Sequence, residues 1–522
     1  MCYHGCNGII ITMKTTTTTL PDDPQTLKKM VLQMQAKLAR KDNLISTLQQ
    51  QLLVLRRRHF GRSSEQVEKQ IHQIELQLEE LETQAAELPD TPVASTEKKA
   101  TPKRRVSLPD HLPRDEMRVE ADKTCPECTG ELSHIGDDVS EVLDVVPASY
   151  RVIKVVRSKY SCNCCQKIIQ GEAPQRVINK GLASAALLTQ VMVDKYLDHQ
   201  PLYRQSERMA REGVDLERST LADWVGQVST LVSPLVEAIG KHVRSADHLF
   251  ADDTTAPTLK PGKGRTQTGR YWTYVRDGRD WNEQAPPAVW LQYSEDRKSI
   301  HPTMHLKGYK GSMQTDAYAG YNDLYQKDVA FTACWAHVRR KFYDITQSGP
   351  APVADQAIAT IQQLYAIEKD IKNKPPDERR RIREQQAIPI LNGFYTWLQA
   401  TLRTLSKGSA LSKAVRYAIN QWEGLVAYAK NGQASIDNNT AERSLRPIAL
   451  GRKNYLFAGS VAGGERAAAL YSLLSTAKLN GLNPSHYLTA VLKRIGQHPI
   501  NRIDELLPWN IDLTLTLPTD AL

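Results

Sequence analysis

The stretch His248–Thr255, HLFADDTT, places two adjacent acids directly after a short run of apolar residues. This pattern predicts a buried β-strand that delivers Asp252 and Asp253 to the edge of a sheet, although an isolated acid pair more often begins a turn. Two further acids stand in unusual settings: Asp316 lies in GSMQTDAYAGY, and Glu442 lies in SIDNNTAERSLRP. Acids from two strands and a helix can converge on divalent metal ions, because Mg²⁺ prefers oxygen ligands.

The bulk composition indicates a protein of several globular units. A chain of 522 residues is too long for one compact domain, so three or four units are expected. No apolar run approaches bilayer-spanning length, so we expect no membrane partner. The net charge of +10 favours polyanionic partners. The eight cysteines are too few and too grouped for a secreted disulfide framework, which predicts a cytoplasmic metal site.

The N-terminal part predicts oligomerisation. Residues 1–23 carry no convincing signal peptide and are expected to be disordered, and Met13 is an alternative start to Met1. Apolar residues recur at spacings of three and four over residues 24–88, which predicts coiled-coil, leucine-zipper-like helices that join protomers. A helical hairpin packed on its own chain is the alternative. Residues 89–113 form a basic linker, either a nonspecific DNA contact or a solvated tether.

Two close-spaced cysteine groups predict a zinc ribbon over residues 114–175. CPEC supplies Cys125 and Cys128, and CNCC supplies Cys162 and Cys165, with Cys164 as the spare. Four thiolates give Zn²⁺ a closed tetrahedral shell, which is typical of a structural site. The alternative is a small β-unit with reduced cysteines, but so small a core is marginal without metal.

Residues 176–240 have the spacing of a helix-turn-helix. One helix is followed by a turn at Gly213 and a second helix that Ser219 is expected to cap. Such turns are also common in helical domains that bind no DNA. Four arginines supply cations for a DNA backbone: Arg204, Arg208, Arg211 and Arg218.

Residues 241–490 predict an α/β domain with a helical insertion at 348–429, followed by a C-terminal tail at 491–522. Tyr271–Val275 and Val289–Tyr293 alternate like antiparallel strands. SMQTD predicts a returning strand, and VAFTACWAHVRRKFYD predicts a strand that runs into a helix, with Cys334 as a small buried residue. The segment DNNTAER predicts a helix that carries Glu442, followed by a turn at GRKN. Basic residues expected to contact DNA are Lys263, Arg265, Arg270, Arg339, Arg340, Arg443, Arg446, Arg452 and Lys453.

Three separated acids are the ligand set that phosphodiester chemistry requires. Two Mg²⁺ (or Mn²⁺) ions roughly 4 Å apart activate the attacking oxygen and stabilise the leaving oxygen. Without metal, crowded carboxylates repel one another, and some stay protonated.

Taken together, the runs resemble transposases of the insertion sequence 66 family. The matching runs are ADDTT, TGRYW, QTDAYAGYN, CWAHVRRKF, DNNTAERSLRP, GRKNYLFAGS, GGERAA, the CPEC and CNCC unit and the terminal ELLPW. The resemblance implies an RNase H-like catalytic domain whose Asp-Asp-Glu triad is Asp252, Asp316 and Glu442. The family usually has Ala-Asp-Glu-Thr where this chain has Ala-Asp-Asp-Thr, so Asp253 replaces a glutamate. Asp437 and Glu465 are the rival third acids.

The resemblance also implies a function. A bacterial, cytoplasmic transposase of this kind would bind terminal inverted repeats, cleave the transposon ends and join the 3′-hydroxyl to target DNA. Its implied partners are double-stranded DNA, further copies of the chain through the coiled coil, and accessory proteins encoded by the same element. Two alternatives stay open: a metal-dependent nuclease of the same fold that does not join strands, and a catalytically inactive, zinc-containing DNA-binding regulator.

Overall fold

The computed structural model describes residues 114–116 and 149–514, apart from 162, 166, 180, 261–264, 317 and 326–328. The chain divides into two compact units, residues 1–146 and 147–522, and every element below belongs to the second. The predicted disordered N-terminus, coiled coil, basic linker and first cysteine pair lie outside the described residues. Within the described residues, no helix is long and apolar enough to cross a membrane.

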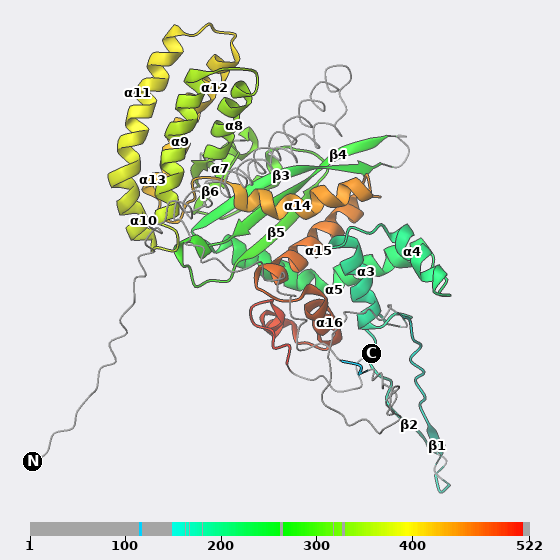
Figure 1. The fold of residues 1–522 in the computed structure, drawn as a ribbon. Coiled ribbons are helices and arrows are strands. Elements are labelled where there is room, and N and C mark those ends of the chain that lie inside the picture. The colour runs from blue at the N-terminus through cyan, green and yellow to red at the C-terminus, as the bar shows by residue number, and fades with distance from the viewer. Residues whose placement is uncertain are drawn as a thin grey trace, which may run out of the picture. The chain divides into compact units, whose positions relative to one another are not determined.

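A five-stranded mixed sheet forms the centre of the second unit (Figure 1). Its strands are β3 His248–Leu259, β4 Thr266–Arg276, β5 Ala288–Ser294, β6 Ser312–Thr315 and β7 Ala330–Ala333. The spatial order is β5-β4-β3-β6-β7. The pairs β3–β4 and β4–β5 are antiparallel, whereas β6 and β7 run parallel to β3. The predicted strands and the mixed α/β class are confirmed.

The central strand β3 is longer than predicted. The apolar pattern placed its end at the two acids, but the strand continues to Leu259, because the long strand β4 pairs with it over its whole second half. Pairing with β6 stops at Phe250, opposite Gln314. Asp252 and Asp253 therefore lie in the middle of β3, at the point where its β6 side is no longer paired.

Helix α15, Val461–Leu479, covers the open edge of the sheet at β5. The backbone N–H groups of Leu291 and Val289 donate to Ser472 Oγ at 2.8 Å and Thr476 Oγ1 at 3.1 Å. These hydroxyls satisfy groups that an edge strand otherwise leaves unpaired. Figure 1 shows α15 beside α14, Asn439–Asn454, which packs against β3 and β4.

The helices before the sheet form the predicted helix, turn and helix, with two corrections. They are α3 Ala185–Tyr196, α4 Leu202–Arg211 and α5 Arg218–Arg244, with Gly213 at φ 78° in the turn. Ser219 does not cap α5, because the helix already begins at Arg218 with Glu217 in the capping position. The predicted boundary at 240/241 falls inside α5, whose buried face shares one core with the sheet.

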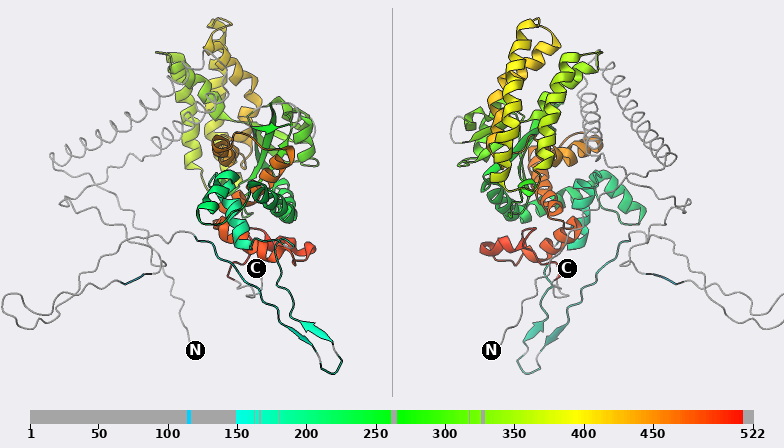
Figure 2. Two further views of the ribbon diagram at one scale, coloured as in Figure 1. Left: turned by 90° about the vertical axis from the view of Figure 1, so that its right-hand side faces the viewer. Right: turned by 60° about the vertical axis from the view of Figure 1, so that its left-hand side comes forward.

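The predicted helical insertion is present and has a core of its own. Its helices are α9 Pro352–Asp370, α10 Pro376–Ile382, α11 Ile388–Thr404, α12 Ala410–Asn420 and α13 Trp422–Lys430, and they pack with α8, Trp335–Thr346. Figure 2 shows α9 and α11 side by side. The insertion contains a charged stretch, KNKPPDERRRIRE, at residues 372–384. One residue of this stretch, Arg383, is fully buried and pairs with Glu368 at 2.6 Å.

The other strands and α-helices are β1 Lys159–Ser161, β2 Ile168–Gln170, α6 Ile300–His305, α7 Asn322–Tyr325 and α16 Pro484–Ile495. There are also short 3₁₀ segments at Arg279–Trp281, Ala319–Tyr321 and Ile500–Leu506, and a π-helical segment at Arg383–Ala387. Strands β1 and β2 form an antiparallel hairpin around the second cysteine group. In that group Cys164 and Cys165 are exposed, whereas Cys125, Cys128 and Cys162 lie outside the described residues.

Candidate active site

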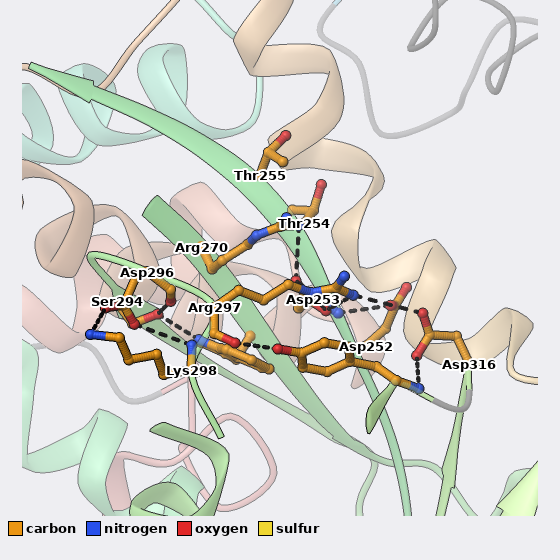
Figure 3. A network of polar contacts seen from close by, with 12 residues as sticks. Asp252, Asp253, Thr254, Thr255, Arg270, Ser294, Asp296, Arg297, Lys298 and Asp316 are labelled. Atoms are coloured by element: carbon orange, nitrogen blue, oxygen red, sulfur yellow. Dashed lines mark hydrogen bonds and ion pairs between the residues drawn. The ribbon is translucent and has the colours of Figure 1, made fainter. Parts of the chain in front are cut away.

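Three elements bring the predicted acids to one region of the sheet. Asp252 lies in the middle of β3, Asp316 directly follows β6, and Glu442 lies in the first turn of α14. The parallel register pairs Phe250 with Gln314, so two residues further along, Asp252 stands beside Asp316. Figure 3 shows these two aspartates next to each other.

The three carboxylates interact electrostatically. Burial raises the pKa of Asp252 well above its ordinary value, and the charges of Asp316, Glu442 and Asp253 raise it further. Burial and the Asp253 charge also raise the pKa of Asp316, while Arg297 acts in the opposite direction. Acids that disfavour one another's ionisation are stabilised by a cation placed among them, so this group suits a divalent metal with oxygen ligands.

Polar contacts fix the start of α14 over β3. The buried side chain of Asn438 donates from Nδ2 to the backbone oxygen of Ala251 at 2.9 Å. Ser444 of α14 bonds through its hydroxyl to Thr273 Oγ1 at 2.7 Å. Thr273 is the β4 partner of Asp252, and directly opposed residues share a face of the sheet. Glu442 is therefore carried by a helix that lies on the same face as Asp252.

Asp253 is an ion-pair partner on the other face. Successive strand residues point to opposite faces, and the Asp253 side chain is fully buried. Its carboxylate pairs with Arg270 at 3.0 Å and with Arg297 at 2.7 Å, as Figure 3 shows. Arg270, one of the residues expected to contact DNA, is therefore engaged with Asp253 within the protein.

Arg297 is the residue at this site that sequence reasoning missed. Besides pairing with Asp253, it lies 4.0 Å from a carboxylate oxygen of Asp316 and stacks 3.7 Å above the Tyr318 ring. The Asp316 carboxylate also accepts the backbone N–H of Tyr318 at 3.1 Å. The only signal in the sequence was a lone arginine after β5, which no local pattern connects to β3.

The rival third acids lie in different surroundings. The Asp437 carboxylate accepts the backbone N–H of Asn439 at 3.2 Å and the hydroxyl of Tyr365 at 3.2 Å. Glu465 is exposed near the start of α15. Neither is among the groups whose charge shifts the pKa of Asp252, whereas Glu442 is. The geometry favours Glu442.

The other predicted DNA-binding residues fall into four groups. Those on the surface are Arg204, Arg211, Arg218, Arg265, Arg443, Arg446 and Lys453, and those that are half-buried are Arg339, Arg340 and Arg452. Lys263 lies outside the described residues. Arg208 of α4 instead pairs with Asp194.

Arg452 is engaged within the protein. It donates to Thr254 Oγ1 at 2.9 Å and to Thr255 Oγ1 at 2.7 Å, and so links α14 to β3. The expected turn at GRKN is wrong, because α14 continues through Asn454.

A second cluster lies at the start of α8. Cys334 is buried as predicted, but its sulfur is grouped with ligand atoms of His337 and Glu442, all within 4.8 Å of one another. Burial raises the pKa of the Cys334 thiol, and the charges of Glu442 and Asp437 add to this rise. The sequence signal was the Cys-x-x-His spacing inside CWAHVRRKF.

Comparisons with known families agree along most of the chain. Residues 180–466 match the family described as "Transposase IS66 family", and residues 472–509 match the "IS66 C-terminal element". Residues 122–166 match the "zinc-finger binding domain of transposase IS66", which supports the structural zinc site. Residues 47–117 match "Transposase C of IS166 homeodomain".

Similar proteins occur in Sinorhizobium fredii. Uncharacterized protein y4jD is 34% identical over 503 residues, which cover 94% of this chain and 97% of that protein. Uncharacterized protein y4hP is 37% identical over 435 residues, which cover 80% of this chain and 78% of that protein. The similarity therefore extends over nearly the whole length of one relative.

Proposed function

The chain belongs to the IS66 transposase family, and we propose that it cleaves the ends of its own element and joins the resulting 3′-hydroxyls to target DNA. The observation that carries this proposal is the placement of Asp252 in β3, Asp316 directly after the neighbouring strand β6, and Glu442 in the first turn of α14, which packs on β3. Three carboxylates from two strands and a helix are the ligand set that this chemistry uses.

The catalytic domain is proposed to be RNase H-like. In support, β3, β4 and β5 form an antiparallel meander, and β6 and β7 then add in parallel on the other side of β3. The helical insertion separates β7 and α8 from α14, which carries the third acid. The two aspartates thus come from neighbouring strands, and the glutamate comes from a helix on the same face.

Asp252, Asp316 and Glu442 would hold Mg²⁺ or Mn²⁺. When bound, the two ions supply activation of the attacking oxygen and stabilisation of the leaving oxygen. Arg297 restrains Asp316 from the opposite face and balances the charge of Asp253.

The DNA contacts are assigned by exposure and charge. Arg443, Arg446 and Lys453 are exposed on α14, the helix that carries Glu442, and would grip the strand backbone. Arg204 and Arg218 would contact the terminal repeats. Cys125, Cys128, Cys162 and Cys165 would hold the structural Zn²⁺. Pairing of two ends through a coiled coil, and the participation of accessory proteins from the same element, belong to the same proposal.

A cleavage and joining assay with labelled terminal DNA tests the proposal. We expect Asp252→Asn, Asp316→Asn and Glu442→Gln each to lower cleavage and joining by about a hundredfold or more, because each removes a metal ligand. Glu465→Gln is the matched control and should keep both activities. Full activity of Glu442→Gln would overturn the assignment.

The same assay separates the alternatives. Cleavage without joined product would indicate a nuclease of the same fold. Equal DNA binding by the wild type and Asp316→Asn, with no Mg²⁺-dependent product from either, would indicate an inactive regulator.

A further inference from the structure

Cys334, His337 and Glu442 bring three kinds of metal ligand to one point. The thiol, an imidazole nitrogen and a carboxylate oxygen lie within 4.8 Å of one another, and His337 Nε2 is 3.9 Å from Glu442 Oε1. Cys334 is the N-cap residue of α8, and His337 lies in the first turn of that helix. Among the described residues, this cluster shares only Glu442 with the three acids of the candidate active site.

Two backbone N–H groups donate to the Cys334 sulfur. The backbone N–H of Asn438 donates to Sγ at 3.2 Å, and the backbone N–H of His337 donates to it as well. The sulfur also stands at the N-terminus of α8, a helix of 12 residues, where the helix dipole favours negative charge. Backbone donors of this kind orient and stabilise thiolate ligands in metal sites.

The three ligand side chains differ in their exposure to solvent. Cys334 is 3% exposed, whereas the side chains of His337 and Glu442 are 28% and 12% exposed. The sulfur is therefore the most buried ligand of the cluster, and the imidazole is the most exposed.

We propose that Cys334, His337 and Glu442 bind Zn²⁺, and that Zn²⁺ bound there withdraws Glu442 from the magnesium site and stops the reaction. Sulfur and nitrogen ligands select Zn²⁺, whereas Mg²⁺ prefers oxygen ligands alone. Three protein ligands leave the fourth tetrahedral position to water. The inference that Zn²⁺ binds depends only on the cluster itself, whereas the inference that Zn²⁺ inhibits the reaction rests on the proposed function.

Titration of the full-length, zinc-ribbon-loaded chain with Co²⁺ tests the binding part, because thiolate ligation of Co²⁺ gives a charge-transfer absorption. We expect the wild type to bind one more equivalent than Cys334→Ser, with the additional absorption missing from the variant. His337→Gln should weaken binding by about tenfold or more, and His486→Gln, an exposed control on α16, should match the wild type. Identical titrations of the wild type, Cys334→Ser and His337→Gln would overturn the site.

Inhibition is tested in the Mg²⁺-supported cleavage assay with added Zn²⁺. Zinc should inhibit the wild type, while Cys334→Ser, whose hydroxyl still accepts the backbone N–H groups, should cleave at the basal rate and resist zinc. Equal inhibition of both proteins would overturn the regulatory role. If the wild type shows no cleavage at all, the proposed function has failed, and the Co²⁺ titration alone still decides whether the metal site exists.

Discussion

Asp252 and Asp253 are neighbours in sequence but have opposite electrostatic surroundings. Asp253 is held between Arg270 and Arg297, whereas Asp252 faces two other carboxylates. The alternation of a strand produces this difference, since one residue points to each face. The resemblance implied that Asp252 is the ligand and that Asp253 is its neighbour. No local pattern predicted Arg297, because its contacts with Asp253 and Asp316 join segments that are distant in sequence.

Replacement of Asp253 is expected to destabilise the fold. Asp253→Asn leaves Arg270 and Arg297 without their counter-charge, which should cost about 2–4 kcal/mol of unfolding free energy, reduced by the partial exposure of Arg297. Chemical denaturation measures the loss. Asp253→Glu keeps the charge and is the control. Equal stability of Asp253→Asn and the wild type would show that the ion pairs contribute little.

Replacement of Asp252 is expected to have the opposite effect on the metal-free protein. Because burial and neighbouring acids disfavour its charge, Asp252→Asn should raise the melting temperature at neutral pH. Adding Mg²⁺ should then stabilise the wild type more than the variant. Asp377→Asn, on the exposed surface of α10, is the control. A lower melting temperature of metal-free Asp252→Asn would contradict the electrostatic crowding of the acids.

At the scale of elements, the helical insertion supports the segment that leads into α14. Arg383 donates to the backbone oxygens of Tyr428, Asn431 and Ala434 at 2.9, 2.8 and 2.9 Å. A few residues later, the oxygen of Ile436 accepts the backbone N–H of Trp335 at 3.0 Å. The sequence indicated helices here, but a charged stretch is ordinarily taken as surface, so the burial of Arg383 could not be predicted from it.

Arg383→Lys is therefore expected to lower both stability and activity. Lysine keeps the charge but loses the guanidinium fork that contacts Glu368 and three carbonyls. The unfolding free energy should fall by about 3 kcal/mol, and DNA cleavage should fall although no ligand has changed. Denaturation and the cleavage assay measure the two effects. The exposed Arg381→Lys is the matched control, and equal activity of the two variants would remove the link between the insertion and Glu442.

The buried side chain of His248, at the start of β3, makes the free energy of unfolding depend on pH. His248 is buried beside Ser312, with Nδ1 2.7 Å from Ser312 Oγ, and burial lowers its pKa from 6.5 to about 3. Between these values the unfolded chain binds a proton that the native protein does not, so stability is lost as the pH falls. In this window His248→Gln should show a shallower fall than the wild type, by up to about 1.4 kcal/mol per pH unit. Parallel denaturation series at several pH values measure the slopes, and equal slopes would contradict the buried neutral imidazole.

At the scale of the molecule, the sequence predicted the classes of the elements better than their extents. Strand and helix periods correctly predicted the α/β alternation and the helical insertion, because both leave a local pattern. The end of β3 was placed too early, because pairing with β4 extends it through a polar stretch. The last turn of α14 was taken as a turn at Gly451, although packing of the helix on β3 and β4 holds it helical. Tertiary contacts decided each of these cases.

The central claim is that Asp252, Asp316 and Glu442 share bound divalent metal. Anomalous diffraction from crystals of the full-length protein soaked in Mn²⁺ tests it most directly. We expect Mn²⁺ density in contact with the carboxylates of all three residues. Mn²⁺ bound to the two aspartates while Glu442 contacts no ion, or no Mn²⁺ among the three at concentrations that support DNA cleavage, would contradict it.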